Sequence, residues 1–341
     1  MKILIVGSDK VYSIENFYVR HMRQAGADVR NFPAQRFFYD HYQKSIVNKI
    51  IFRAGLSGIL RRINAALLKE VEAFRPSVVW VFKGMEIYPS TLEKIRQRGI
   101  KLVNYNPDNP FIFSGAGSGN KHVQQSIGLY DLHFTYNLAI RDQLEKQYGM
   151  RTAFLPFGYE LDDREYLEFA KEKEVSRVCF AGNPDAQRAS FLMSLLESGI
   201  PIDVIGNDWD KFIRHPLAGL YGPVYKDAFW RVLRKYRVQL NLLRIHNEDS
   251  HNMRTFEAPG VGGIMLAPRT TEHMLFFTDG EDAFLYGDLD ECKEKINYLL
   301  SMPEGQAAEI RARARARSVT AGYSYRDRAM HALNILEGLN A

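Results

Sequence analysis

The sequence predicts an α/β protein with two Rossmann-like parallel-sheet domains that face a central cleft. Three observations lead to this fold class. The chain has 341 residues, which is more than one average domain. Short apolar runs alternate with helical patterns in both halves, which is typical of parallel sheets covered on both faces. A charged segment that is poor in β-branched residues, 158–174, separates the halves and is expected to be a linker.

The first half begins with an apolar run that reads as a buried strand, and the rhythm of strand and helix continues to the linker. In chain order we expect a strand at 2–6, a helix near 14–25, a strand at 28–32, a long helical pattern at 45–74, a strand at 77–84, a helix opened by Pro89, strands at 100–106 and 131–137, a helix at 138–148 and a strand at 152–158.

The second half repeats this rhythm. We expect a strand at 176–182, a helix at 186–198, a strand at 201–206, a helix at 226–236, strands at 238–244, 263–267 and 282–287, a helix opened by Asp288 to Asp290, and mostly helical chain after Pro303.

Composition indicates a globular protein of a reducing compartment. Hydrophobic residues make up 46% and charged residues 25% of the chain. The two cysteines offer neither a disulfide framework nor a metal cluster, and Cys179 lies in an apolar run that reads as core. No apolar run approaches the length of a membrane span, and the start, "MKILIVGSDK", turns polar too soon for a signal peptide. We therefore expect a cytoplasmic protein.

The net charge of +5 conceals an asymmetry between the halves. Residues 1–158 hold 22 Lys and Arg against 12 Asp and Glu, and the remainder holds 23 against 28. A basic first half suits an anionic partner, such as a membrane surface, a phosphorylated acceptor or nucleic acid. Ordinary surface charge is the alternative.

The stretch "HNMRTFEAPGVGG" (251–263) combines a cation and a carboxylate between two apolar runs. We expect a short helix over 252–258, stopped by Pro259, whose N-terminus suits a phosphate group. Glu257 lies late in this helix, where it does not favour the dipole, so we expect it to accept hydrogen bonds from two ligand hydroxyls. The alternative is that Arg254 and Glu257 form a surface pair worth little energy.

Two further strand ends carry polar residues. "FAGNPDAQRASFL" (180–192) places Gly182 at a strand end and Arg188 in the first turns of a helix, where a guanidinium can fork onto a diphosphate. "IGNDW" (205–209) ends another strand and carries an exposed-looking Trp209. Because the carboxyl ends of parallel strands lie at one edge, strand ends at 182, 206 and 246 predict a nucleotide-diphosphate pocket.

These pieces carry a family resemblance over most of 150–335. The chain contains, in this order, F-x-G-N-x-x-x-x-R, I-G-x-x-W, N-x-R-x-F-E-x-x-x-x-G-G and "DLDECKEKINYLLSMPE". This series resembles glycosyltransferases of the GT-B fold. Among them it is most similar to the group of spore maturation protein CgeB and its glycosyltransferase 4-like relatives. The resemblance implies an acceptor-binding domain of residues 1–157 plus the C-terminal helix 322–341, and a nucleotide-sugar donor-binding domain of residues 175–321.

The resemblance also implies donor-binding residues in the second domain. Arg188 would meet the diphosphate, Glu257 the ribose hydroxyls, and the region around Trp209 and Tyr225 would border the base. The expected donor-binding set is Gly182, Asn183, Arg188, Gly206, Trp209, Tyr225, Asn252, Arg254, Thr255 and Glu257.

Three residues are the candidates for catalysis. Asp108 lies on the rigid loop "NYNPDNPF" after a strand and is a candidate general base, with a turn-forming role as the alternative. Asp249 precedes Glu257 by eight residues, similar to the Glu-x7-Glu motif of family 4 enzymes, although the glycines that usually follow the first acid are absent. His251 is expected to reach the transferred sugar or to cap the helix. His122, in the Gly/Ser loop 114–122, is the candidate acceptor-binding residue.

We expect no metal ion and no cofactor beyond the nucleotide-sugar co-substrate. Of the two D-x-D triplets, 208–210 and 288–290, the second more simply caps a helix. A helix over 49–68 has an apolar stripe and a basic stripe, which suits contact with a membrane surface, while a core-facing helix with a solvated side is the alternative.

The sequence thus predicts a metal-independent, hexosyltransferase-type glycosyltransferase of polysaccharide or glycoconjugate biosynthesis. It would transfer a sugar from a nucleotide-diphospho-sugar to a glycan, lipid-linked or other hydroxyl acceptor, in the cytoplasm or at the inner face of the membrane, without nucleic acid as a partner. The alternatives are a nucleotide-sugar epimerase of the same fold and a non-catalytic nucleotide-binding or nucleic-acid-binding module.

Overall fold

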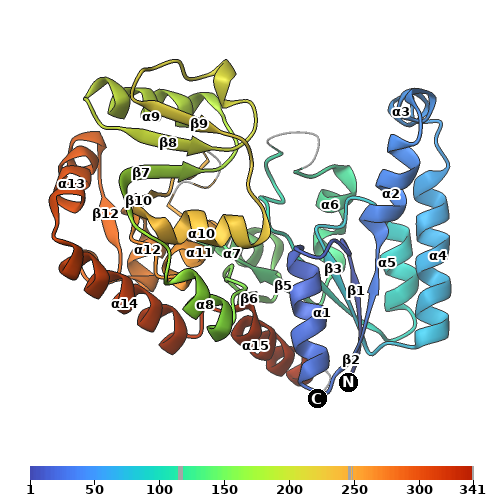
Figure 1. The fold of residues 1–341 in the computed structure, drawn as a ribbon. Coiled ribbons are helices and arrows are strands. Elements are labelled where there is room, and N and C mark those ends of the chain that lie inside the picture. The colour runs from blue at the N-terminus through green and yellow to red at the C-terminus, as the bar shows by residue number, and fades with distance from the viewer. Residues whose placement is uncertain (114–117, 245–246, 248, 340–341) are drawn as a thin grey trace. The chain divides into compact units, whose positions relative to one another are not determined.

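The computed structural model describes residues 1–113, 118–244, 247 and 249–339 (Figure 1). The chain divides into two compact units, Met1–Pro156 with Tyr325–Ala341, and Phe157–Ser324. The segment 158–174, expected to be a linker, contains helix α8 (Asp163–Phe169) and belongs to the second unit. Across the described residues, no helix is long and apolar enough to cross a membrane.

Unit 1 is a six-stranded parallel sheet in the order β2-β1-β3-β4-β5-β6, with helices on both faces (Figure 1). Its elements are β1 (Lys2–Val6), α1 (Ile14–Gln24), β2 (Asp28–Phe32), α2 (Ala34–Gln43), α3 (Ile46–Arg53), α4 (Ile59–Phe74), β3 (Val78–Phe82), α5 (Pro89–Arg96), β4 (Lys101–Tyr105), α6 (Lys121–Ser126), β5 (Leu132–Thr135), α7 (Leu138–Tyr148), β6 (Thr152–Phe154) and α15 (Tyr325–Gly338).

The two faces of this sheet are packed differently because successive strand residues point to opposite sides. Leu4 and Val79 belong to an aliphatic cluster that includes residues of α4 and α5. Trp80 lies on the other side, where its ring centroid is 4.9 Å from that of Tyr18 on α1. Tyr325 of α15 joins this aromatic layer, 6.0 Å from Tyr18. The last helix is therefore part of the core of unit 1.

The predicted helical pattern at 45–74 is two helices, and the predicted helix 49–68 does not exist as one element. Gly55 has φ +75°, a conformation that side-chain-bearing residues rarely adopt, and it lies between α3 and α4. The apolar stripe is divided accordingly. Ile63 and Leu67 of α4 are buried, whereas no residue of α3 is fully buried.

Unit 2 is a second six-stranded parallel sheet, in the order β12-β11-β10-β7-β8-β9 (Figure 1). Its elements are α8, β7 (Val175–Ala181), α9 (Ala186–Glu197), β8 (Ile202–Ile205), β9 (Ala218–Tyr221), α10 (Lys226–Lys235), β10 (Tyr236–Leu240), α11 (Arg254–Gly260), β11 (Met265–Pro268), α12 (Thr271–Phe276), β12 (Phe284–Tyr286), α13 (Leu289–Ser301) and α14 (Glu304–Thr320).

The core of unit 2 lies between this sheet and helices α9 and α13. Val178 and Val238 from the central strands pack with Leu192 of α9 and Ile296 of α13 in one buried cluster. Cys179 points to the opposite face and is fully buried, which confirms its prediction as a core residue. Pro303 precedes α14, where a proline is tolerated because the first N–H groups of a helix have no partner.

Candidate functional site

The strand order of unit 2 reverses between β7 and β10, which extend the sheet in opposite directions from the centre. In open parallel sheets, ligands bind beyond the carboxyl ends of the strands at such a switch point. Residues from "FAGNPD" follow β7, and the segment leading to α11 follows β10. The predicted strand end at 246 lies outside the described residues, and β10 ends at Leu240.

A pocket of about 250 Å³ lies at this edge. Of the predicted site residues, Arg188 and Asp249 line it. The sequence reasoning missed a second cation, Arg244, although it stands in "VQLNLLRI" (238–245), the apolar run before 251–263. The pocket is lined by Gln187, Arg188, Phe191, Leu242, Leu243, Arg244, Asp249, Pro268, Thr270 and Tyr286.

Arg188 connects the segments that follow the two central strands. The side chain of Asp185 caps α9 by accepting from the Arg188 backbone N–H, 2.9 Å away, and so fixes the residue in the first turn. The guanidinium donates to the main-chain oxygens of Asn183 (3.2 Å) and Leu242 (2.8 Å). Burial lowers the pKa of Arg188 and Asp185 opposes this shift, and the group stays charged at neutral pH.

Arg254 and Glu257 lie at the same edge and form an ion pair, with Nη1 2.7 Å from Oε2. The Arg254 guanidinium also donates to the Ala181 main-chain oxygen at the end of β7, 3.2 Å away, and lies 4.4 Å from the ring centroid of Phe229. The Glu257 side chain is only 12% exposed, so this is not the solvated surface pair considered as the alternative. Burial raises the pKa of Glu257, and Arg254 opposes the rise.

Both arginines keep a buried donor unused. The Nε atoms of Arg188 and Arg254 have no hydrogen-bond partner among the described residues, although Arg188 Nε lies 3.5 Å from Asp185 Oδ2 in an ion pair. A buried guanidinium N–H normally finds an acceptor, because leaving it unpaired costs about 1–3 kcal/mol. The two guanidinium groups bring two positive charges to one strand edge, which suits an anionic ligand.

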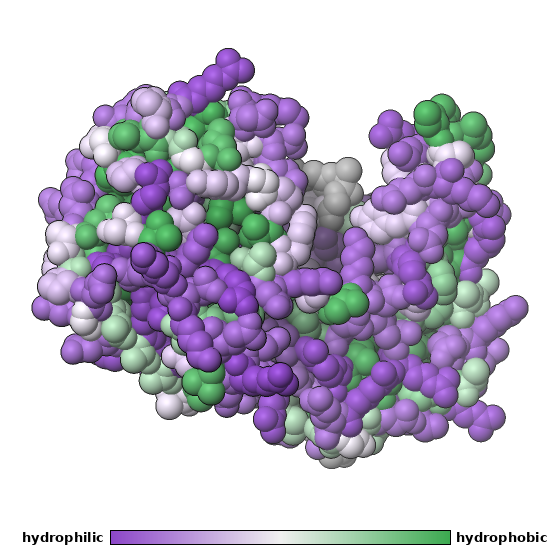
Figure 2. Space-filling model, in the orientation of Figure 1, coloured by the Kyte–Doolittle hydropathy of each residue, from purple (hydrophilic) through white to green (hydrophobic). Residues whose placement is uncertain are grey.

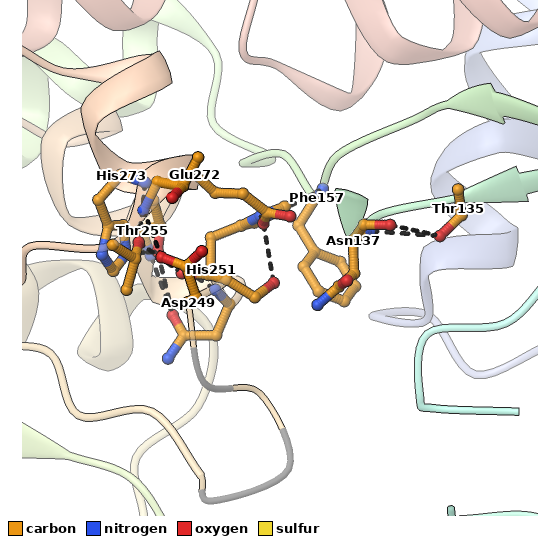
Figure 3. Close-up of polar contacts among 12 residues, drawn as sticks. Thr135, Asn137, Phe157, Asp249, His251, Thr255, Glu272 and His273 are labelled. Atoms are coloured by element: carbon orange, nitrogen blue, oxygen red, sulfur yellow. Dashed lines mark hydrogen bonds and ion pairs between the residues drawn. The ribbon is translucent and has the colours of Figure 1, made fainter. Parts of the chain in front are cut away.

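Asn252 and Thr255, predicted to bind the donor, are engaged within the protein. Asn252 Nδ2 donates to Asn241 Oδ1 (2.7 Å), and the Asn252 side-chain oxygen accepts from the Thr255 N–H (3.2 Å). Thr255 Oγ1 lies 2.9 Å from Nε2 of the buried His273, whose other ring nitrogen contacts the Pro268 main-chain oxygen (Figure 3). These bonds fix α11 to the ends of β10 and β11.

His251 does not have the position that a catalytic role requires. Its side chain is fully buried, its Nδ1 contacts Glu272, and its Nε2 accepts from the Phe157 N–H at 3.3 Å (Figure 3). The ring packs among Phe157, Phe256 and Phe276. The catalytic prediction for His251 is therefore corrected: the residue holds the entry to α11 in place.

Asp249 remains at the pocket. Its backbone has φ +55°, and Oδ1 accepts from the N–H of Thr271, the first residue of α12, at 2.6 Å. The residue is exposed and lines the pocket. One carboxylate oxygen of Asp249 is thus fixed to the start of α12, while the residue lines the pocket.

The predicted base-contacting residues have different surroundings. Trp209 is 2% exposed, so the sequence-based expectation of an exposed side chain is wrong. Its Nε1 donates to the Gly182 main-chain oxygen at 2.7 Å. A Cβ on Gly206 would lie 2.2 Å from that oxygen, so this close approach requires glycine. Tyr225 is 67% exposed at the N-cap of α10.

Unit 1 has its own switch point, between β1 and β3. Lys83 follows β3 with φ +60° and forms an ion pair with Asp108, 2.5 Å from Nζ to Oδ2. Glu15 of α1 accepts from the Ser8 N–H after β1 at 2.9 Å. Burial raises the pKa of Glu15 and of Glu86, and Lys83 opposes both shifts. Sequence reasoning found Asp108 and missed the other charged groups, although the Lys-Gly pair after a buried strand was a usable signal.

His122 lies on the first turn of α6. Its Nδ1 is 3.1 Å from the Met85 main-chain oxygen, and its ring packs against Tyr88. Residues 114–117 of the loop that precedes it lie outside the described residues. The structure therefore places His122 beside the segment that follows Lys83.

The two D-x-D triplets have structural roles. Asp288 caps α13 by accepting from the Glu291 N–H at 2.9 Å, which confirms the cap predicted from the sequence. Asp208 forms an ion pair with Lys211 at 2.6 Å. Within the described ranges, no group of three or more His, Cys, Asp or Glu side chains is placed to hold a metal ion.

Comparisons with known proteins agree with this architecture. Residues 187–334 match the family model described as glycosyl transferase-like. None of the curated proteins matches the chain. Sucrose-phosphate synthase of Thermosynechococcus elongatus is similar in structure, with 10% identity, 99% of each chain covered and a TM-score of 0.70.

Two ligand-bound structures are also similar. HepE of Anabaena in complex with UDP-glucose has 14% identity and a TM-score of 0.63, over 99% of this chain and 100% of that one. UDP-GlcNAc 2-epimerase of Neisseria meningitidis bound to UDP-GlcNAc has 12% identity and a TM-score of 0.57, over 99% and 100%. The two parallel-sheet units are the two Rossmann-like domains of the GT-B fold, and the glycosyl transferase-like region covers most of the second unit and the first ten residues of α15 in unit 1.

Proposed function

We propose that the protein is a glycosyltransferase that uses a nucleotide-diphospho-sugar as donor. The single observation that carries the proposal is the pair of mostly buried guanidinium groups, Arg188 and Arg254, which are held at the switch point of unit 2 by bonds to main-chain oxygens. The match of residues 187–334 to the glycosyl transferase-like model supports it. The structures of HepE and of the epimerase, which hold nucleotide sugars on the same fold, support it as well.

In this proposal the two arginines bind the diphosphate. Both are anchored to main-chain oxygens, Arg188 to Leu242 and Arg254 to Ala181, so they would keep their positions as the sugar leaves. Fixed donors in a site of low dielectric stabilise developing negative charge without reorganisation, and this effect is usually the largest catalytic contribution. The same arginines would make a metal ion unnecessary.

Glu257 is proposed to bind the ribose. Its Oε2 accepts from Arg254, and Oε1 is left to accept from a vicinal diol. The ion pair would therefore position the carboxylate for the ribose while its cation faces the phosphates. Gly206 and the buried Trp209 would hold the backbone at Gly182 in place beside the ligand.

The acceptor and the base are proposed from sequence and local geometry. Asp108, at the end of β4 and paired with Lys83, is the candidate base in unit 1. Asp249, at the pocket, is the candidate that contacts the transferred sugar. The acceptor is proposed to be a hydroxyl of a glycan or of a lipid-linked molecule, as expected from the sequence.

The test is a thermal-shift panel of nucleosides, nucleoside diphosphates and nucleotide sugars, each in the presence of EDTA. We expect at least one nucleoside diphosphate to raise the melting temperature, since a ligand at 100 times its Kd adds about 2.7 kcal/mol. Arg188→Ala should abolish the shift and Arg214→Ala, which changes an exposed arginine, should not. If no nucleotide stabilises the protein, the proposal fails.

An activity assay with the nucleotide sugar that binds then distinguishes a glycosyltransferase from an epimerase. A glycosyltransferase releases the nucleoside diphosphate faster when an acceptor is added, whereas an epimerase converts its donor without a second substrate. The similarity to the neisserial epimerase is the observation that keeps this alternative. A nucleic-acid-binding module would show strongly salt-dependent affinity for oligonucleotides and none for nucleotide sugars.

A further inference from the structure

An apolar tip projects from unit 1 at helix α3. It consists of Ile46 (75% exposed), Val47 (61%), Ile50 (60%) and Leu56 (76%). Figure 2 shows hydrophobic surface at the position of α3, next to hydrophilic surface. Single exposed apolar residues are normal, but a contiguous set rimmed by polar residues marks an interaction surface.

The packing of α3 explains which of its faces is free. Phe52 points inward, and its ring centroid is 4.9 Å from that of Phe38 and 5.6 Å from that of Tyr42 on α2. Asn48 Nδ2 donates to the His41 main-chain oxygen at 2.7 Å on the same side. The aromatic contact and this hydrogen bond attach α3 to α2. The apolar tip therefore contributes nothing to the core, and folding alone does not require its side chains to be apolar.

The chain around the tip is basic, although Asp40 precedes this stretch and Glu70 follows it. Residues 41–69 contain no Asp or Glu. They contain six basic residues, Lys44, Lys49, Arg53, Arg61, Arg62 and Lys69. A surface that combines exposed Leu and Ile with Lys and Arg is attracted to anionic lipid headgroups and gains hydrophobic energy by insertion at the acyl boundary. A second copy of this chain would meet its own positive charge there.

We propose that the apolar tip inserts into the interface of an anionic phospholipid bilayer, with Lys44 and Arg53 contacting the headgroups. Both basic side chains are exposed next to the tip. This contact is peripheral and reversible, because the apolar tip is small. The proposal does not depend on the donor site, since every residue that carries it lies in unit 1.

The experiment is co-sedimentation of the full chain with vesicles of phosphatidylcholine alone or with about 30% phosphatidylglycerol, whose negative surface potential attracts basic side chains. Binding is expected only with the anionic vesicles and should weaken as salt is raised, since the surface potential is screened within a Debye length. Equal binding to both vesicles, or none to either, overturns the proposal.

Two pairs of variants locate the contact. Ile50→Glu is expected to lower the partition coefficient at least about tenfold, whereas Leu167→Glu, which changes an equally exposed leucine of α8 in unit 2, leaves it unchanged. Lys44→Gln with Arg53→Gln should lower it about tenfold as well. Lys94→Gln with Arg96→Gln on α5 is the matched control for charge.

Two further readouts keep the result clear. Circular dichroism spectra and melting temperatures of the variants establish that they fold, so that lost binding is not lost structure. Sedimentation of the wild type without lipid tests the other occupant of the tip. A dimer that Ile50→Glu dissociates, with no vesicle binding, would assign the tip to a second copy and overturn the membrane proposal. Failure of nucleotide binding would leave the vesicle result unaffected.

Discussion

Arg254 and Glu257 form a mostly buried ion pair, 2.7 Å between Nη1 and Oε2, at the end of β7. The spacing of three residues places both side chains on one face of α11, and the bond to the Ala181 main-chain oxygen fixes the arginine to the sheet. A cation and a carboxylate in fixed relation suit a ligand that carries phosphates and a diol side by side. This relationship determines the first prediction.

Glu257→Gln should weaken binding of the preferred nucleoside diphosphate about tenfold, because charge-assisted hydrogen bonds to the ribose become neutral ones. The diagnostic ligand is the 2′,3′-dideoxy nucleotide. Wild type should lose affinity when the hydroxyls are removed and the variant should lose much less, as calorimetry can measure. Glu197→Gln, on the exposed end of α9, is the control. If both proteins lose equally, Glu257 does not contact the ribose.

Arg188→Lys should weaken nucleoside diphosphate binding at least about tenfold while leaving the affinity for the bare nucleoside within about twofold. Lysine keeps the charge but cannot donate to Asn183 and Leu242 and to a phosphate together. Titration of both ligands by calorimetry measures the difference. Equal losses for the two ligands would mean that the substitution distorts the pocket and that Arg188 is not the phosphate contact.

Trp209→Phe should lower the free energy of unfolding by about 1–3 kcal/mol, because the Gly182 main-chain oxygen loses its buried donor. Nucleotide affinity should change by less than about twofold if the residue only supports the loop. Urea unfolding and ligand titration test the two parts separately. Unchanged stability with reduced affinity would instead restore the base-contacting role predicted from the sequence.

The sequence was sufficient for the alternating order of strands and helices, because buried parallel strands are apolar runs and glycines follow them. It was insufficient where a contact between distant residues decides the structure. Trp209 looked exposed in "IGNDW", yet its donor bonds a main-chain oxygen 27 residues earlier in the chain. The sequence makes His251 a catalytic candidate, but Glu272 and Phe157 occupy its ring nitrogens.

Some elements leave a weak local signal. Strand β9 lies at the sheet edge and includes Gly219 and the exposed Tyr221, so it has no apolar run and was not predicted. Helix α8 lies inside the charged segment that is expected to be a linker. Asp162 and Glu165 form a capping box, which is a sequence signal for the start of a helix. For this segment the capping box predicts the helix, whereas the charged composition predicts a linker.

The last prediction concerns pH. Burial lowers the pKa of His133 to about 4 from an ordinary value of 6.5. The unfolded chain therefore binds a proton between these values that the folded chain does not, so His133 stabilises the protein above pH 6.5 and this stabilisation is lost as the pH falls toward 4. Between pH 7 and pH 5 the loss amounts to about 2 kcal/mol.

The carboxyls of Glu15, Glu86 and Glu257 have raised pKa values and act in the opposite sense, since their folded forms retain protons longer as pH rises. The measurement must therefore compare wild type with a single variant. His133→Gln keeps a donor for the Ile127 main-chain oxygen, which lies 2.9 Å from Nε2 in the wild type, and removes the titration. Between pH 7 and pH 5 the free energy of unfolding of this variant should fall about 2 kcal/mol less than that of wild type. If the free energies of unfolding of the two proteins change in parallel with pH, His133 is not the group responsible.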